Sequence, residues 1–274
     1  MFALLAALLL AGCGQENTTG VGQPEVRPTI VSLNPCIDAV LAEVADPRQV
    51  LALSHWSRDP ASSSVPQDVA RRYRVTGGTV EEVLALKPDL VLASSFVDPA
   101  TRNALDDLGL QVEAFGIADT IAASEEQVQR IAALTGNPAK GERLVRKIGA
   151  ALAKAAPPPG KQPVDTVLWQ PGGIVPGQGT LIAELLRRTG FANGAAARGY
   201  AQGDYLPLEA VVANPPELLL VAGNEAGQAH PVLEALPTTR RERLEPALLY
   251  CGGPTMIRAA ERLGKLRLSM EAQR

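Results

Sequence analysis

One short segment of the sequence, residues 54–60, brings together three side chains that suit the binding of a large, flat molecule. His55, Trp56 and Arg58 supply an imidazole, an indole and a guanidinium, which together suit a ligand with flat apolar and anionic parts. The segment follows an apolar run that predicts a strand, and open α/β sheets bind ligands at the carboxyl ends of their strands. The chain has only two His and two Trp, so this grouping predicts a ligand-binding loop. The alternative is a surface loop with one half-buried Trp.

Three more aromatic side chains have a comparable placement in the second half of the chain. Trp169 ends a predicted strand and leads into the sequence PGG. Tyr200 and Tyr205 lie in a glycine-containing loop at 198–205. We expect all three to face the same ligand cleft as the His55 loop.

The sequence contains few of the motifs that a catalytic site requires. Ser57, His55 and Asp59 could be drawn as a triad, but neighbours in one loop rarely orient as nucleophile, base and orienting acid. There is no G-x-S-x-G motif, and the glycine-rich stretch 172–179 has the spacing of neither common phosphate-binding loop. The two His stand far apart, at 55 and 230, whereas a metal site needs three or four ligands. We therefore expect no enzyme, no catalytic residue, no resident cofactor and no metal site, with His55 as a single axial or outer metal ligand left open.

An internal repeat singles out one acidic residue in each half of the chain. Residues 80–92 (VEEVLALKPDLVL) and 208–220 (LEAVVANPPELLL) are identical at six of thirteen positions, which predicts one helix–turn–strand unit used twice. Glu82 has a local task as the acid of a T-x-x-E capping box, but Glu81 and its counterpart Glu209 have none. Two interpretations are open: a favourable charge near a helix N-terminus, or two matched acidic groups that pair with arginines of a partner.

Short apolar runs alternate with helical stretches on both sides of a helical middle section. Strands are predicted at 29–33, 50–53, 90–93, 112–115, 166–169, 218–222 and 248–251, and helices at 36–44, 80–86, 99–108, 124–134, 138–156, 181–188 and 254–263. Strands separated by helices indicate parallel sheets. Ser124 is expected to cap its helix, with Gln127 at the capping-box position. The helix at 138–156 ends at PPPG and connects the two halves, and such a helical connection resists wide hinge motion.

The composition supports a folded chain of one large or two modest domains. The 274 residues carry a net charge of −3, with 46% hydrophobic and 20% charged residues. This balance, without a block of like charge, argues against a nucleic-acid partner. We predict an α/β fold with the following organisation: a leader at 1–12, a tether at 13–26, a first lobe at 27–122, a helical linker at 123–160 and a second lobe at 161–274.

The first residues predict an export signal with a lipid-attachment site. Residues 2–12 are all apolar or small and would form about 16 Å of helix, against about 30 Å for a membrane's hydrocarbon core. They fit the apolar region of a signal peptide, although no Lys or Arg precedes Arg27 to provide its basic start. The sequence LAGC resembles a bacterial lipobox, in which Cys13 is lipidated and becomes the mature N-terminus. Residues 14–24 are typical of a flexible tether.

Two cysteines remain after Cys13. Cys36 and Cys251 lie near opposite ends of the chain and in different predicted lobes. Export permits a disulfide, but this separation leads us to predict free, partly buried thiols.

Several segments together resemble the solute-binding proteins of iron-complex and cobalamin ABC transporters. They are VSLNPCIDAVLAEV, ALSHWSRDP, GGTVEEVLALKPDLVLASS, the helix at 138–156, and PLEAVVANPPELLLVAG. The likeness runs from about residue 27 to residue 263, and no single motif carries it. It implies two Rossmann-like lobes joined by a single long α-helix, with the ligand in the cleft between them. The stretch around Trp56 matches one that supplies an aromatic contact in relatives that bind cobalamin, although that position is often Tyr elsewhere.

The resemblance also implies a function and a set of partners. Proteins of this kind carry one glutamate per lobe that docks on arginines of the membrane permease, and Glu81 and Glu209 fall at those positions. We therefore expect a monomeric, lipid-anchored periplasmic protein that delivers a metal chelate (cobalamin, an iron–siderophore or haem) to an ABC permease dimer with its ATPase subunits. The membrane is contacted through the lipid alone, and no nucleic acid is involved. The alternatives are a periplasmic hydrolase that uses the same cleft and a scaffold lipoprotein whose cleft is vestigial.

Overall fold

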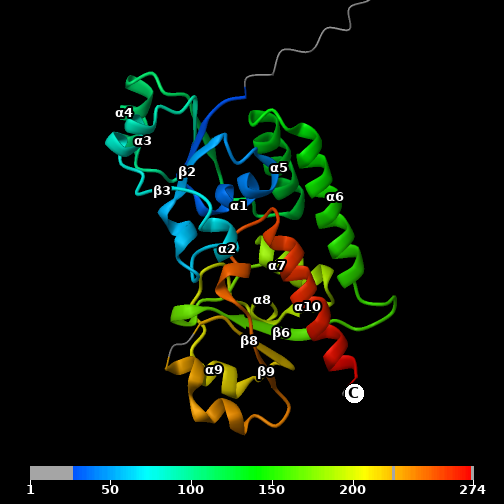
Figure 1. Cartoon of the computed structure of the whole chain (residues 1–274). Helices are drawn as coiled ribbons and strands as arrows, with labels where there is room; N and C mark the ends of the chain where they lie inside the picture. Colours follow the sequence, from blue (N-terminus) through cyan, green and yellow to red (C-terminus); the bar gives the residue numbers. More distant parts are fainter. Residues whose placement is uncertain (1–26, 224–225, 273–274) are drawn as a thin grey trace, which may run out of the picture.

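Two separate parallel β-sheets, one in each lobe, form the framework of the protein (Figure 1). The computed structural model describes residues 27–223 and 226–272. The leader and tether expected at 1–26, and with them Cys13, lie outside these described residues. The first sheet takes its strands from residues 30–115 and the second from residues 164–243. The predicted α/β fold with two lobes is therefore confirmed.

The first lobe is built around a five-stranded sheet with the order β3-β2-β1-β4-β5. All its pairings are parallel. Strands β1 and β4 lie inside the sheet and are almost completely buried, as their apolar sequences predict for internal parallel strands. The elements of this lobe are β1 (Ile30–Ser32), α1 (Pro35–Val44), β2 (Val50–Ser54), the 3-10 turn η1 (His55–Arg58), α2 (Gln67–Ala70), β3 (Val75–Thr76), α3 (Val80–Leu86), β4 (Leu90–Ser94), α4 (Pro99–Asp107) and β5 (Val112–Phe115).

The second lobe contains a four-stranded parallel sheet with the order β7-β6-β8-β9. Its central strand β8 is fully apolar and buried, whereas the edge strand β9 has the sequence RRER and is half exposed. The elements of this lobe are β6 (Val164–Trp169), η2 (Pro171–Gly173), α7 (Leu181–Arg188), β7 (Phe191–Asn193), α8 (Gly194–Ala197), α9 (Leu208–Ala213), β8 (Leu218–Val221), η3 (Gly227–Ala229), η4 (Pro231–Ala235), β9 (Arg240–Arg243) and η5 (Pro246–Leu248).

Three helices connect the lobes along one side of the molecule (Figure 1). The long helix predicted from the sequence is α6 (Pro138–Ala155), whose 18 residues span about 27 Å. It packs against α5 (Ile121–Leu134) before it and against the C-terminal helix α10 (Thr255–Glu271). The absence of a side chain at Gly141 lets α6 approach Ala132 of α5 closely. The connection is therefore a packed group of helices.

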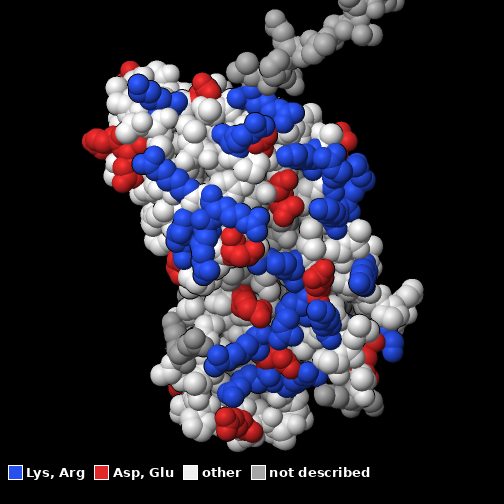
Figure 2. All heavy atoms as spheres, viewed as in Figure 1, with Lys and Arg blue, Asp and Glu red and all other residues white. Residues whose placement is uncertain are grey.

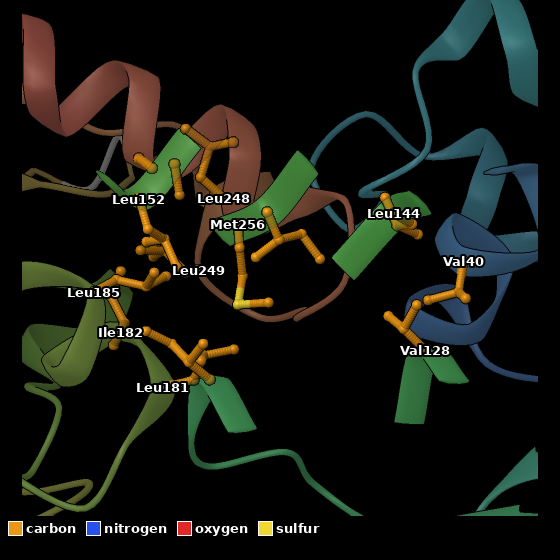
Figure 3. Packing of buried hydrophobic residues seen from close by; sticks show 14 of the residues in the cluster. Val40, Val128, Leu144, Leu152, Leu181, Ile182, Leu185, Leu248, Leu249 and Met256 are labelled. Carbon is orange, nitrogen blue, oxygen red and sulfur yellow. The ribbon is translucent and has the colours of Figure 1, made fainter. Parts of the chain in front are cut away.

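A single apolar core runs from one lobe into the other through these helices. Figure 3 shows Val40, Val128 and Leu144 on the side of the first lobe and Leu181, Ile182 and Leu185 on the side of the second. Met256 of α10 lies between the two groups. Opening the lobes widely would expose part of this core to water, at about 25 cal/mol for each Å² of apolar surface. The connection therefore favours a nearly fixed separation of the lobes.

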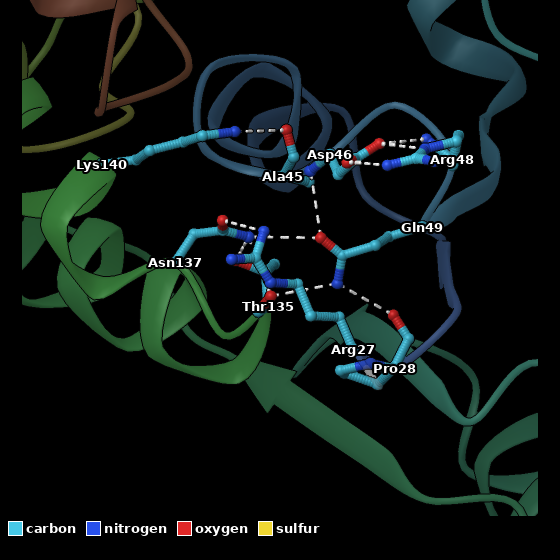
Figure 4. Close-up of polar contacts among 9 residues, drawn as sticks. All are labelled: Arg27, Pro28, Ala45, Asp46, Arg48, Gln49, Thr135, Asn137 and Lys140. Carbon is cyan, nitrogen blue, oxygen red and sulfur yellow. Dashed lines mark hydrogen bonds and ion pairs between the residues drawn. The ribbon is translucent and has the colours of Figure 1, made fainter. Parts of the chain in front are cut away.

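A polar network fastens the turn between α5 and α6 to the first lobe (Figure 4). The buried amide of Gln49 donates to the carbonyl oxygens of Pro28 and Thr135, at 3.1 and 3.0 Å. Its oxygen accepts a hydrogen bond from the Asn137 amide at 3.2 Å, and Asn137 in turn accepts one from Arg27 at 2.7 Å. Because each buried amide has partners, the network can be buried at little cost.

Some elements differ from those that the sequence predicts. The segment predicted as a last strand at 248–251 is irregular, and β9 lies a few residues before it. Helix α5 begins three residues before Ser124, with Thr120 as its N-cap. Ser124 instead accepts a hydrogen bond from the backbone of Gly253 at 2.7 Å, so it joins α5 to the segment before α10.

Candidate functional site

A cavity of about 740 Å³ lies between loops of the two lobes. The first lobe contributes residues 117–119, which follow β5. The second lobe contributes Gln170 after β6, residues 176–182 at the start of α7, and residues 199–202 and 249–250. Since ligands of open parallel sheets bind outside the carboxyl ends of the strands, this is the place where the fold offers a ligand site.

The lining of this cavity is apolar and neutral, with a single charged side chain. Ile117 and Tyr250 lie in it with 75% and 55% of their surfaces exposed. Its polar side chains are mainly those of Gln170, Gln178 and Gln202, which can donate and accept hydrogen bonds without carrying charge. Among the described residues that line it, Asp119 is the only charged one, and none is Lys, Arg or His.

The first lobe presents a row of exposed apolar side chains at the same edge of its sheet. Trp56, Phe96 and Ile117 are 48%, 73% and 75% exposed. Each stands two residues after the end of a strand, namely β2, β4 and β5. Because the strands are parallel, their carboxyl ends share one edge. Exposed apolar groups gathered in one place typically mark a binding surface, so this row extends the candidate site beyond the cavity.

The predicted His55 loop is only partly assembled as a binding cluster. The rings of His55 and Trp56 lie 4.5 Å apart between centroids, and both residues are exposed. Arg58 turns away from them, because its guanidinium donates a hydrogen bond to the Tyr73 carbonyl at 2.7 Å. None of the three lines the cavity itself. Trp56 belongs to the row of exposed apolar side chains, and the ring of His55 lies next to it.

A buried carboxyl group beneath η1 holds this loop in position. Asp38 of α1 is fully buried, and one of its oxygens accepts hydrogen bonds from the Ser54 backbone at 3.1 Å and from the hydroxyls of Ser54 and Ser57 at 2.6 and 2.5 Å. Burial raises the pKa of Asp38 to about 7, against the lowering effect of these hydrogen bonds.

The three other aromatic residues have different outcomes. Tyr200 is half-buried and lines the cavity. Tyr205 is 63% exposed but lies outside the lining. The prediction that Trp169 faces the cleft is wrong, because its indole is only 3% exposed and donates to the Leu206 carbonyl at 3.0 Å. It packs in a small core cluster of the second lobe, which also contains Leu206 and Val175.

Glu81 and Glu209 occupy equivalent places in the two lobes. Each lies in the first turn of its helix, α3 or α9, and each is exposed. These helices lie on the same side of the upper and lower lobes in Figure 1, and acidic side chains gather over α3 in Figure 2. In the described part of the chain, neither carboxylate makes a hydrogen bond or ion pair within the protein.

Glu82 has the local role expected of it, although its partners differ from those of a simple capping box. Thr79 accepts a hydrogen bond from the Glu82 backbone at 3.3 Å, as predicted. The Glu82 carboxylate, however, accepts from the Thr76 hydroxyl and from the backbone of Gly77 and Gly78. These hydrogen bonds lower its pKa, and they fix the loop in front of α3.

The prediction that Cys36 and Cys251 are free is wrong. Their sulfurs are bonded, with an S–S distance of 2.14 Å and a Cα–Cα distance of 5.0 Å. Cys36 lies in the first turn of α1, in the first lobe. Cys251 directly follows Tyr250 of the cavity lining. Separation along the chain misled the prediction, because the segment before α10 returns from the second lobe and packs against α1.

The described part of the chain contains no group of three or more His, Cys, Asp or Glu placed to hold a metal ion. Over the same residues, none of the helices combines the length and the hydropathy that a membrane crossing requires.

Comparison with known families and relatives places this geometry among binding proteins. A family model described as "Periplasmic binding protein" matches residues 30–243. A protein named "Cobalamin-binding protein" from Halobacterium salinarum is 28% identical over 219 residues, which cover 76% of this chain and 57% of that protein. The chain thus spans little more than half the length of this relative. The "Uncharacterized ABC transporter substrate-binding lipoprotein YvrC" of Bacillus subtilis is 24% identical, with 96% of this chain and 94% of that protein covered.

Solved structures share the fold. The periplasmic heme-binding protein RhuT from Roseiflexus sp. RS-1 superposes with a TM-score of 0.71 at 21% identity, over 88% of this chain and 97% of that one. The periplasmic vitamin B12 binding protein BtuF of Vibrio cholerae gives a TM-score of 0.67 at 18% identity, over 88% of this chain and 97% of that one.

Proposed function

The chain belongs to the periplasmic binding protein family, and we propose that it is the substrate-binding component of an ABC importer for a metal chelate. The observation that carries this proposal is the cavity between the lobes together with the exposed row Trp56, Phe96 and Ile117 beside it. A largely preformed site of this kind binds a bulky ligand without a large closure. The names of the relatives, which include cobalamin-binding and ABC substrate-binding proteins, support the same proposal.

We propose cobalamin as the ligand among the three chelates that the sequence left open. The rim of a corrin ring carries neutral amide groups, which the glutamine side chains of the cavity can meet with hydrogen bonds. Haem carries two carboxylates, and many ferric siderophores carry several negative charges. A site that binds such anions usually provides arginine or lysine, and the described lining provides neither, with Asp119 adding a repulsive charge.

The test is a spectral titration of the purified chain with three probes: cyanocobalamin, haemin and ferric enterobactin, a strongly anionic tris-catecholate siderophore complex. We expect saturable one-to-one binding of cyanocobalamin and weak or no binding of the other two. Tighter binding of haemin or ferric enterobactin would overturn the choice of ligand. No binding of any of the three would overturn the proposed function.

Trp56→Ala is expected to weaken the binding of the chelate about tenfold. The substitution removes a half-exposed indole whose apolar contact with the ligand is worth roughly 1–2 kcal/mol. The same titration measures this effect. Trp169→Phe is the matched control, since this indole is buried in the core and does not reach the cavity. Equal losses in both variants would show that the effect on Trp56 reflects folding rather than contact.

The remaining features of the proposal concern the location and the partners of the protein. It is periplasmic, monomeric and held at the membrane by a lipid on Cys13. It binds its ligand without transforming it and passes it to a permease dimer with ATPase subunits. The lipoprotein name of the Bacillus subtilis relative supports the anchor. Mass spectrometry of the mature N-terminus tests it, and an unmodified terminus would contradict it.

A further inference from the structure

Tyr250 lines the cavity and was not predicted from the sequence, and the residues directly before and after it are buried. Its side chain is 55% exposed and lines the cavity. The residues on either side of it, Leu249 and Cys251, are only 9% and 3% exposed. The backbone is therefore anchored in the protein interior directly before and after Tyr250.

The residues that follow Tyr250 are anchored by contacts with α1 and α5. Cys251 is bonded to Cys36 at the start of α1. Two residues later, the Gly253 amide donates to the Ser124 hydroxyl of α5 at 2.7 Å. A Cβ atom at Gly253 would lie 2.8 Å from Val40 of α1, and one at Gly252 would collide with Ser124. The segment thus passes through a space that accepts only glycine.

The disulfide is the only covalent link within the described residues between α1 and the segment before α10. Hydrogen bonds nearby join the loop after η1 to η5 and to α10: Ser64 donates to the Ala247 carbonyl at 3.0 Å, and Arg258 donates to the Ser64 carbonyl. A single hydrogen bond stabilises a fold by about 0.5–1.5 kcal/mol. Loss of the covalent link would therefore leave Tyr250 on a segment held by non-covalent contacts alone, namely hydrogen bonds and the packing of Leu248 and Leu249 in the core.

We propose that the Cys36–Cys251 disulfide is a redox-sensitive clip across the cleft, which holds Tyr250 in place as a contact residue for the ligand. The proposal rests on the proposed function for the ligand contact. When a dithiol reductant attacks the disulfide, two electrons and two protons pass to the cysteines, which become two thiols, and the reductant becomes a cyclic disulfide. In the reduced state the segment 249–253 moves more freely, and ligand binding must then order Tyr250. The reduced protein binds more weakly for this reason.

Hydrogen exchange tests the conformational part without any ligand. The full mature chain is compared in its oxidised form and after reduction with dithiothreitol and alkylation. We expect exchange to become at least several-fold faster in residues 249–253, with little change in α7 or β4. Unchanged exchange at 249–253 would overturn the clip. Uniformly faster exchange across both lobes would also overturn it, because the bond would then support the whole fold rather than one segment.

Titration with cyanocobalamin tests the ligand part. We expect reduction to weaken binding about 3- to 10-fold, the factor that corresponds to ordering one side chain and its backbone. Tyr250→Ala should bind as weakly as the reduced protein and should lose its sensitivity to reduction. The double variant Cys36→Ser/Cys251→Ser should behave as the reduced form with or without dithiothreitol, which controls for effects of the reductant elsewhere.

The outcomes separate the two proposals. If the oxidised protein binds the probe and reduction changes nothing, the clip is wrong and the binding function stands. If the oxidised protein binds none of the three chelates, the proposed function fails. The role of Tyr250 as a contact residue then fails with it, while hydrogen exchange still decides whether the disulfide controls the segment.

Discussion

A chain that carries Glu81→Ala and Glu209→Ala together is expected to lose most of its ability to support transport while it binds its ligand normally. The two carboxylates are exposed, lie at equivalent places in the two lobes, and have no partner within the described part of the protein. Neither lines the cavity. An arginine–carboxylate pair formed with a permease would therefore be lost without any change in the ligand site.

The size of the effect follows from the strength of such pairs. A hydrogen-bonded charge pair at a protein interface contributes about 1.5–3 kcal/mol, which is roughly a tenfold to hundredfold change in affinity. We expect each single variant to reduce transport about tenfold and the double variant to reduce it about a hundredfold or more. The measurement is ligand uptake by the permease complex in proteoliposomes, with ligand affinity measured separately on the purified variants.

The matched control is Glu126→Ala/Glu261→Ala. It removes the same amount of charge from two other exposed acidic residues, on α5 and α10. This variant should transport as the unmodified protein does. If both double variants lose transport equally, net charge and not docking is responsible, and if neither does, the docking role of Glu81 and Glu209 is wrong.

The repeated helix–turn–strand unit is the part of the fold that the sequence predicts most accurately. The helix predicted at 80–86 is α3, and the repeat places α9 and β8 at the corresponding positions of the second lobe. Local features set these elements, since a Pro stands two residues before each strand and both strands are apolar apart from Ser94 at the end of β4. Strand β9 was missed because it is a charged edge strand, where Arg240 pairs with Glu242 rather than with the core.

Apolar residues outside regular elements were harder to interpret. Leu248 and Leu249 belong to a run that predicts a strand, but they are buried because they pack into the core shared by the two lobes (Figure 3). Short apolar runs do not separate these two cases. Phe96 and Ile117 were missed for a related reason. Their only signal is a position two residues after a strand end, which can be recognised only once the strand ends are known.

From the sequence, the residues of the site could be grouped only where they lie within a single loop. The sequence grouped His55 and Trp56, and the structure brings their rings together. The sequence did not predict contacts between distant segments. The pairing of Cys36 with Cys251 is one of these, because it depends on how the last helix returns to the first lobe. The direction of Trp169 depends in the same way on Leu206, far along the chain.

The buried carboxyl group of Asp38 is expected to make the stability of the protein fall as the pH rises. Its pKa is about 7 in the folded protein, against 3.8 in an unfolded chain. Between these two values the folded state keeps the proton while the unfolded state has lost it, so the free energy of unfolding decreases with rising pH. The contribution is complete below about pH 4 and is lost by the time the pH has passed 7. At 1.36 kcal/mol for each pH unit, this group accounts for a loss of about 4 kcal/mol.

Asp38→Asn removes the titration and keeps a side chain of similar size beside Ser54 and Ser57. The free energy of unfolding is measured with urea at pH 4 to 8. We expect the value for the variant minus the value for the unmodified protein to increase by about 4 kcal/mol from the lower to the higher pH. Asp59→Asn is the control within the same loop. Hydrogen bonds from Ser62 and Ala61 lower the pKa of Asp59, so its contribution to stability is lost only as the pH falls below about 4. The control keeps Asp38 and should therefore lose stability between pH 5 and 8 as the unmodified protein does, so that the difference between the two stays constant over this range.

The cause of the raised pKa supplies a second, independent check. Burial is the largest influence on Asp38, and the groups that contact it are the hydroxyls of Ser32, Ser54 and Ser57 and one backbone amide, without a charged partner. Salt screens interactions between charges but not burial, so the pH trend should persist at high ionic strength. A trend that salt abolishes, or one that Asp38→Asn retains, would mean that another group titrates. If the trend does belong to Asp38, ionisation at high pH acts directly beneath η1, and chelate affinity should weaken over the same pH range because Trp56 stands on that turn.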